Sequence, residues 1–251
     1  MKKTWLYINL ITGLLSAWLF IDHISGFIPH DYFFIQNPDT TLYSGINVVS
    51  RWADFSFFTY HTMIFYSIWS VGLFITHALK LARANNFFTH TATVTFIQTN
   101  YILTTVLYTV FELASGNPTF GLYDFSNKAI HSLGTNLLAH YVFSAIAIIS
   151  GFKLKCGGKL TTTPFICIAI YLIIYYIAVK LTGMHCYKIE WYPYPFLHPT
   201  LLCNMLGIKT PTPALSTTIS IITTLILAAC YFGLYYGVYK LRSLIENRKA
   251  K

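Results

Sequence analysis

The chain has 251 residues, of which 55% are hydrophobic and only 10% are charged. Soluble globular proteins carry about 25% charged residues, so this composition excludes a soluble domain with a water-facing surface. The net charge of +9 does not indicate nucleic-acid binding, because Lys and Arg stand in short clusters beside apolar segments rather than on one basic face. We therefore expect membrane lipids, and no nucleic acid, as partners.

Six apolar segments are long enough to cross the hydrocarbon core of a bilayer, which takes about 20 residues. The predicted spans are roughly 4–25, 55–82, 89–114, 129–152, 162–182 and 214–241. The first exceeds the apolar core of a signal peptide and no cleavage motif follows it, so we interpret it as an uncleaved span. The sequence predicts an all-α polytopic membrane protein with one six-helix domain over residues 1–251.

The distribution of positive charge predicts the orientation of these spans. With the N-terminus inside, 12 of the 17 Lys and Arg residues are cytoplasmic and the other 5 are outside. Positive charge prefers the cytoplasmic side, so both termini are predicted to be cytoplasmic. The outer loops, at about 26–54, 115–128 and 183–213, are longer than the inner ones. Long ordered loops often carry function, so we expect any chemistry in the outer half.

The loop after the fifth span contains the cysteines that could pair. Cys186 and Cys203 would form a disulfide if this loop faces an oxidising compartment. With His185 and His198 they are also the nearest approach to a zinc site. No tight ligand pair or H-E-x-x-H pattern supports one, so we predict no metal and no cofactor.

Polar residues gather in the second, third and fourth spans, where they must face the bundle interior or a cavity because hydrocarbon cannot solvate them. The second span opens with Thr59, Tyr60 and His61. The third and fourth spans carry Gln98, Asn100, Thr104, Thr105, Thr109, Glu112, His131, Asn136 and His140. Glu112 is either an interfacial residue or a partner for a buried histidine.

His140 lies about 16 Å into the fourth span at 1.5 Å per residue. Asn136, one turn above it, can fix the tautomer of the imidazole. A neutral histidine at this depth is suited to act as a general base, while a simple helix–helix hydrogen bond would favour the same burial. Thr59 becomes a nucleophile only if His140 or His61 takes its proton. Thr59 lies only about one turn inside its span, so it meets His140 only if the helices tilt or are staggered.

Three stretches of the chain occur in a specific order. They are Phe55-Ser-Phe-Phe-Thr59-Tyr60-His61-Thr62, Asn136-Leu-Leu-Ala-His140-Tyr-Val and Trp191-Tyr-Pro-Tyr-Pro-Phe-Leu-His198-Pro. In this order and spacing they resemble the androgen-induced-gene family of membrane proteins, including its bacterial six-span relatives. The run from Thr95 to Tyr108 also looks like that family. The likeness extends from the second span through the Trp191 loop.

The resemblance implies a six-helix fold, location in a bacterial cytoplasmic membrane, and a catalytic pair known from the animal members. In those members an intramembrane Thr/His pair hydrolyses lipid esters, notably fatty-acid esters of hydroxy fatty acids. Thr59 and His140 match the Thr and His of the family. The chain has Ser144 where the bacterial relatives tend to have Pro, and His198 where they tend to have an acidic residue.

The leading hypothesis is a hydrolase of lipid carboxylic esters in which His140 activates Thr59. An acyltransferase would use the same residues with a lipid alcohol in place of water. Donors for the oxyanion would come from Tyr60, Asn136 or the loop tyrosines Tyr192 and Tyr194. The remaining candidate pocket residues are His61, Asn100 and Glu112.

Two other classes of function remain open from the sequence. In a transporter or small-molecule-binding protein, the polar third span and His140 would line a path for an amphipathic ligand. The chain shows no broken span pairs and no inverted repeat of the kind transporters use. In a structural scaffold the same polar groups would only join helices.

Overall fold

The computed structural model describes residues 3–25, 58–114, 137–158, 161–185, 203, 206–208 and 210–249. The chain divides into two compact units. Unit 1 comprises Met1–Ile28, Phe58–Leu160 and Leu234–Lys251, and unit 2 comprises Pro29–Phe57 and Thr161–Gly233. The regular structure of the described residues is helical, apart from one isolated bridge between His90 and Gly157.

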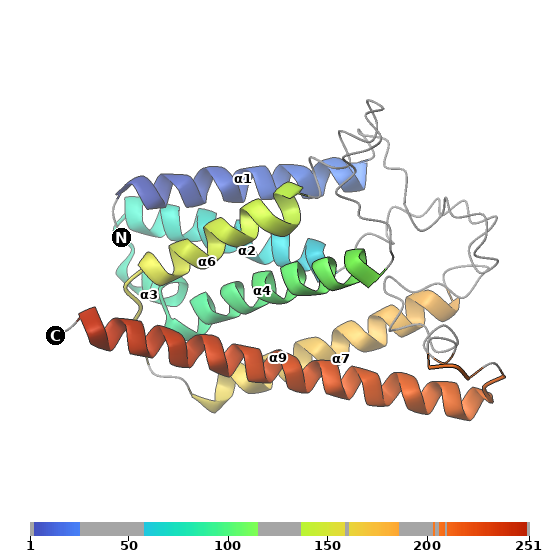
Figure 1. The fold of residues 1–251 in the computed structure, drawn as a ribbon. Helices are drawn as coiled ribbons and strands as arrows, with labels where there is room; N and C mark the ends of the chain where they lie inside the picture. The colour runs from blue at the N-terminus through green and yellow to red at the C-terminus, as the bar shows by residue number, and fades with distance from the viewer. Residues whose placement is uncertain are drawn as a thin grey trace. The chain divides into compact units, whose positions relative to one another are not determined.

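The helices follow the chain as Figure 1 labels them. They are α1 (Lys3–Ser25), α2 (Phe58–Ala78), α3 (Ala82–Phe88), α4 (Thr91–Ala114), the π-helical turn η2 (Leu138–Val142), α6 (Phe143–Lys153), α7 (Thr162–His185) and α9 (Pro213–Lys249). The turn η2 runs directly into α6. The first six of these elements belong to unit 1, α7 belongs to unit 2, and α9 continues from unit 2 into unit 1.

Within the described parts of the chain, four helices are long and apolar enough to cross a membrane, at residues 3–21, 58–78, 162–179 and 213–247. The predicted all-helical architecture is confirmed for the described residues, and these helices are compatible with an integral membrane protein. The apolar helix at 138–153 is shorter. The 24 residues of α4 are long enough, but its sequence is interrupted by polar residues.

The predicted second span was too long at its C-terminal end. The helix α2 ends at Ala78, and the segment predicted as a loop at 83–88 lies in the short helix α3. Lys80 has a φ of 55°, and the amide of Leu81 donates to the carbonyl of Thr76 at 2.9 Å. A residue with left-handed backbone at this position is a common way to end a helix. This helix end could not be predicted from the sequence, because glycine usually occupies the left-handed position and here it is Lys80.

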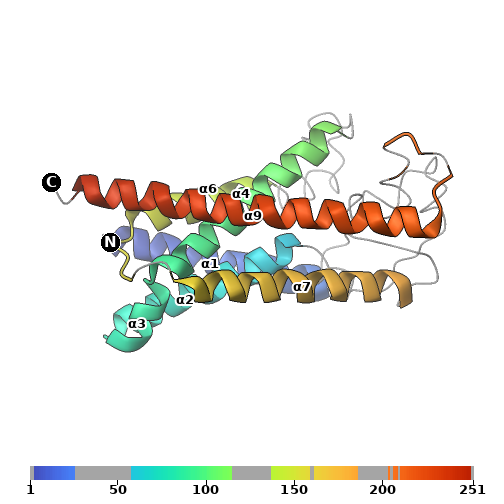
Figure 2. The same ribbon diagram turned by 90° about the horizontal axis from the view of Figure 1, so that it is seen from below.

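The helices α1 and α2 pack side by side in unit 1, and α4 crosses them obliquely (Figure 2). The approach is close at Gly13, where an added Cβ would lie 1.7 Å from Oγ of Ser70. Ser67 donates to the Gly13 carbonyl at 2.9 Å, and the hydroxyl of Tyr66 donates to Oδ1 of Asn9 at 2.9 Å. Small residues allow membrane helices to approach closely, and polar side chains then bond across the contact.

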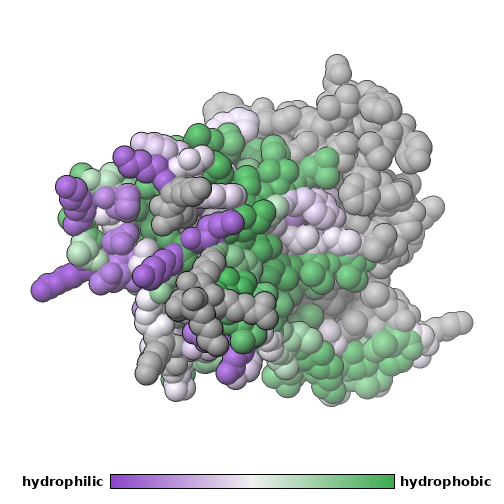
Figure 3. Space-filling view, turned by 60° about the vertical axis from the view of Figure 1, so that its left-hand side comes forward, coloured by the Kyte–Doolittle hydropathy of each residue, from purple (hydrophilic) through white to green (hydrophobic). Residues whose placement is uncertain are grey.

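Unit 1 buries several strongly polar side chains beside its apolar core, and many of its large apolar side chains face outward. Asn9, Gln98 and Asn100 are fully buried, whereas Ile11 is 58% exposed and Trp18 53% exposed. In a water-soluble protein Asn and Gln are mostly exposed. Figure 3 shows hydrophobic side chains over much of the visible surface and hydrophilic ones gathered toward one side. This distribution is the one expected when lipid surrounds the helices.

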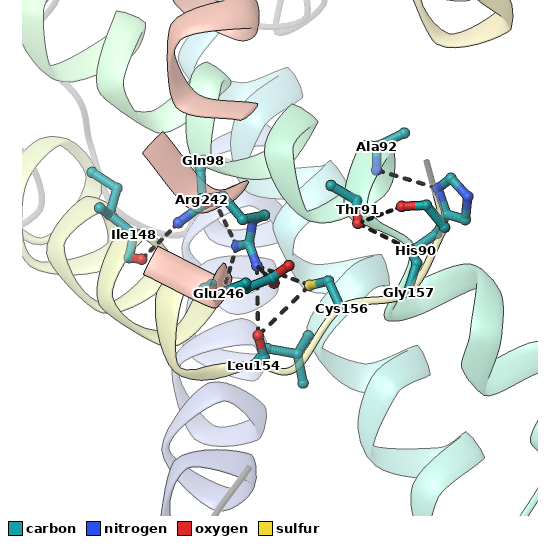
Figure 4. Close-up of polar contacts among 12 residues, drawn as sticks. His90, Thr91, Ala92, Gln98, Ile148, Leu154, Cys156, Gly157, Arg242 and Glu246 are labelled. Carbon is teal, nitrogen blue, oxygen red and sulfur yellow. Dashed lines mark hydrogen bonds and ion pairs between the residues drawn. The ribbon is translucent and has the colours of Figure 1, made fainter. Parts of the chain in front are cut away.

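Arg242, one of the 12 positive residues predicted to be cytoplasmic, lies near the end of α9 and is 1% exposed. Figure 4 shows its guanidinium between α4 and the end of α6. It donates to Oε1 of Gln98 (2.8 Å), to the carbonyls of Gly151 and Leu154, and to Sγ of Cys156 (2.9 Å). Glu246, one turn further along α9, is 3.5 Å from the guanidinium. These contacts attach the end of α9 to unit 1.

Candidate functional site

His140 lies in the π-helical turn η2, where the chain is wound more loosely than in an α-helix. The imidazole is 8% exposed, and Nδ1 has no hydrogen-bond partner in the described part of the chain. Single π-turns inside α-helices occur frequently at functional sites. A buried polar atom without a partner is uncommon in proteins, so His140 is the first candidate for chemistry in unit 1.

The surroundings of His140 fix both its backbone and its ring. Its carbonyl accepts hydrogen bonds from the hydroxyls of Thr105, at 2.6 Å, and Ser144, at 2.8 Å. The ring of Tyr108 stacks on the imidazole, with centroids 3.7 Å apart and an interplanar angle of 9°. Tyr108 therefore covers one face of the imidazole, and Nδ1, on the edge of the ring, has no partner among the described residues.

Hydrogen bonds between α2, α4 and η2 define how these helices are aligned. Thr62 on α2 and Thr104 on α4 share a hydrogen bond of 3.2 Å between their hydroxyls. The neighbouring residue Thr105 bonds His140, and Tyr108 stacks on it. Measured along the axis of α4, the imidazole therefore lies beside the stretch that begins one residue after Thr104 and ends about one turn after it.

Thr59 lies in the first turn of α2, three residues before Thr62, and is half-buried. Because α2 and α4 run in opposite directions, three residues back along α2 corresponds to about 4.5 Å forward along α4. We infer that Thr59 and the imidazole of His140 lie at similar depth. The stagger of the helices accounts for a mismatch in depth that counting residues from the ends of predicted spans had indicated.

Two other candidates on α2 have aromatic neighbours. Tyr60 is half-buried, with its ring 6.1 Å from that of Phe20 on α1. His61 is half-buried and meets the ring of Phe65 edge-on at 6.5 Å. Tyr60, the residue after Thr59, therefore lies at the contact between α1 and α2.

Of the remaining predicted pocket residues, the structure describes the side chain of one. Asn100 on α4 is fully buried, and its amide donates to the Phe96 carbonyl, one turn back, at 3.0 Å. This local bond anchors the side chain to its own helix. Glu112 lies on α4, but its side chain is outside the described residues, as are Asn136, Tyr192 and Tyr194.

The described residues contain no group of three metal-binding side chains. Cys203 is buried with a free thiol. The other members of the proposed disulfide and zinc set, Cys186 and His198, lie outside the described residues, and so does the side chain of His185.

Further buried hydroxyls lie deeper in unit 1 than His140. Thr95 and Thr99 on α4, and Ser150 on α6, are fully buried, and their hydroxyls have no hydrogen-bond partner among the described residues. Threonine in a membrane helix usually bonds the carbonyl one turn back, so these hydroxyls are available to a bound polar molecule. The sequence pattern identifies Thr104, Thr105 and Thr109 of α4 as interior-facing but not Thr95 or Thr99, and it assigns no role to Tyr108 or Ser150.

Comparisons of the chain with family models, with curated proteins and with solved structures gave no match. The chemistry of the site must therefore be argued from its own residues. A buried imidazole with an unpartnered nitrogen can take a proton from a hydroxyl.

Proposed function

We propose that this chain is a six-span integral membrane protein, with both termini in the cytoplasm, that hydrolyses lipid carboxylic esters. In this proposal Thr59 is the nucleophile and His140 the general base. The observation that carries it is the buried imidazole, held by Thr105, Ser144 and Tyr108, at the inferred depth of Thr59. The resemblance of the segments around these two residues to the androgen-induced-gene family supports the same assignment.

The reaction would proceed through an acyl-enzyme. Oγ of Thr59 attacks the ester carbonyl carbon while His140 accepts the hydroxyl proton. The tetrahedral intermediate collapses, the bond to the alcohol breaks, and His140 returns the proton to the leaving alcohol. Water then attacks the acyl-Thr59 ester with the same base, which releases the fatty acid and restores the hydroxyl.

The oxyanion of the intermediate needs hydrogen-bond donors positioned in advance. The hydroxyl of Tyr60 is adjacent in sequence to Thr59, and the amide of Asn136 is one turn from His140. Tyr192 and Tyr194 would add donors from the loop above the site. Replacing water by a lipid alcohol in the second step would give an acyltransferase with the same residues.

Covalent labelling with a fluorophosphonate probe tests the nucleophile and the base. Thr59→Ala and His140→Gln should each lower the labelling rate of the purified, folded protein by about 100-fold or more, since general-base catalysis contributes roughly 10²–10⁴-fold. Thr59→Ser should keep the label, and mass spectrometry should find the adduct on residue 59. A fatty-acid release assay on a lipid ester should follow the same order.

Two matched variants make the assignment specific. Thr62→Val removes the hydroxyl one turn from Thr59, and His61→Gln removes the other imidazole on that turn. Both should keep most of the labelling. Loss of label in His61→Gln but not in His140→Gln would move the base to α2. An unlabelled wild-type protein that binds lipid esters without cleaving them would reject the hydrolase.

The second candidate is a membrane protein that binds a small amphipathic molecule without cleaving it. The unpartnered hydroxyls of Thr95, Thr99 and Ser150 favour it, because a bound polar group would satisfy them. Replacing Thr99 by Val would then weaken ligand binding. Under the hydrolase proposal the same variant leaves fluorophosphonate labelling unchanged.

A further inference from the structure

One end of unit 1 contains a cavity of about 160 Å³ that no step of the proposed reaction uses. Its polar lining consists of Lys3, His77, Asn85, Thr89 and Lys155. These residues come from the start of α1, the end of α2, the helix α3 and the connections after α3 and α6. Segments far apart in the sequence thus place several nitrogen donors around one cavity.

Asn85 places a side-chain amide, which carries two N–H donors, in the lining of the cavity. Its Oδ1 lies 3.4 Å from the Thr76 hydroxyl, whose single proton has a shorter acceptor in the Gly72 carbonyl at 2.8 Å. Lys3 and Lys155 carry ammonium groups on exposed side chains. The cavity is therefore lined by donors and positive charge, a combination that selects an anion.

Among the described side chains, no carboxylate lies beside the positive charge of this cavity. Of the side chains that the structure describes, Glu246 is the single acid, and it pairs with Arg242 at 3.5 Å. The cavity lining contains no carboxylate. An external anion is thus the group that would balance Lys3 and Lys155.

The other wall of the cavity is apolar, and it lies at the ends of the membrane-crossing helices. Leu6, Leu73 and Leu154 form this wall and are buried. The candidate spans start at Lys3 and end at Ala78, so the cavity is at the height where a bilayer has its headgroups.

Exposed apolar side chains lie on the connection that closes the cavity. Leu79 is 64% exposed and Phe87 62% exposed, on either side of the exposed Arg83. Apolar side chains beside basic ones are typical of segments that lie in the membrane interface. The cavity therefore adjoins lipid rather than bulk water alone.

We propose that this cavity binds the phosphate of an anionic phospholipid headgroup. Lys3, Lys155 and the Asn85 amide hold the phosphate oxygens, and the leucine wall contacts the glycerol and the start of the acyl chains. Basic pockets between membrane helices bind anionic headgroups in this way. The site is separate from Thr59, because 18 residues of α2 between Thr59 and His77 span about 27 Å.

The test measures the thermal unfolding midpoint of the full-length protein in neutral detergent micelles during titration with phosphatidylglycerol. Phosphatidylcholine and inorganic phosphate are the comparison ligands. Phosphatidylglycerol should raise the midpoint at a low mole fraction, while the other two should have little effect. Equal protection by phosphatidylcholine, or by inorganic phosphate at millimolar concentration, would overturn the proposal.

The decisive variant is the double substitution Lys3→Gln with Lys155→Gln, which removes two exposed charges. Each lysine would lose a charge-assisted hydrogen bond to the phosphate, which is worth roughly a factor of ten or more, so the apparent affinity for phosphatidylglycerol should fall at least about 100-fold. Arg83→Gln with Lys153→Gln removes the same charge from exposed positions of the same end outside the cavity. An equal loss in this control pair would mean diffuse attraction and would reject the site.

Discussion

Arg242 and Gln98, 144 residues apart in the chain, share a hydrogen bond of 2.8 Å inside unit 1. The amide nitrogen of Gln98 in turn donates to the carbonyl of Ile148 on α6 at 2.8 Å. Gly151 leaves room for this arrangement, since a Cβ there would lie 2.6 Å from the Gln98 side chain. One glutamine thus orients the guanidinium and joins α4 to α6, so the attachment of α9 depends on α4.

Replacing Gln98 by Leu and replacing Arg242 by Met should each destabilise the protein. The first change leaves the buried guanidinium without one of its acceptors, and the second leaves Oε1 of Gln98 and the carbonyls of Gly151 and Leu154 without their donor. A buried group left unsatisfied costs about 1–3 kcal/mol. The double variant should lose less unfolding free energy than the sum of the two single losses, and the difference, which is the coupling energy, should be about 1–3 kcal/mol. Thermal unfolding in detergent measures all three.

Lys240→Met is the control for this cycle, because Lys240 is exposed and lies over the ring of Tyr236. Its effect should be within about 0.5 kcal/mol. Additive effects of Gln98→Leu and Arg242→Met would contradict the arrangement in which Gln98 orients the guanidinium.

The close approach of α1 and α2 gives a second prediction. Gly13→Ala would put a methyl group 1.7 Å from Oγ and 2.8 Å from Cβ of Ser70. We expect a loss of about 1–3 kcal/mol from overpacking, seen as a lower unfolding midpoint. Ser70→Gly in the same chain should recover part of the loss, because it removes both atoms.

Gly237→Ala is the matched control, since nothing lies within 4 Å of a Cβ added at that helical position. Alanine is a better helix former than glycine by about 1 kcal/mol, so this variant should be neutral or slightly more stable. Equal destabilisation at positions 13 and 237 would show that the α1–α2 contact is looser than described.

The short helix α3 was expected to be a loop, whereas α1, α2, α7 and α9 could be predicted from the sequence because each is an apolar run of membrane-crossing length. The contacts between them could not. The buried polar face of α1 is visible in hindsight as Asn9, Thr12, Gly13 and Ser16, spaced at helical intervals. The sequence does not single out this face, because α1 carries no ionisable residue in its middle and fewer strongly polar residues than α2 and α4.

Two parts of the candidate site left no signal in the sequence. The π-turn around His140 depends on where Thr105 and Ser144 can reach its carbonyl, and Thr105 is 35 residues away. The stacking of Tyr108 on His140 depends likewise on the alignment of two helices. The burial of Arg242 left no signal for a similar reason, because its hydrogen-bond acceptors lie 86 to 144 residues away.

The thiol of Cys156 gives a prediction about pH. Burial raises the pKa of Cys156 to about 11, although Arg242 acts in the opposite direction. Burial disfavours the thiolate, and the thiolate is the form that reacts with maleimides. In a chain whose other cysteines are alanine, the rate of alkylation of Cys156 should therefore keep rising about tenfold per pH unit beyond pH 9.

The control is Gly157→Cys in a Cys156→Ala background, an exposed position with open space around its Cβ. Its rate should level off near the ordinary thiol pKa, about 8.5. Limited access of the reagent would lower the rate at Cys156 by the same factor at every pH, so the pH at which each rate levels off is the quantity to compare. Equal values for Cys156 and the cysteine at position 157 would contradict the burial of this thiol beside Arg242.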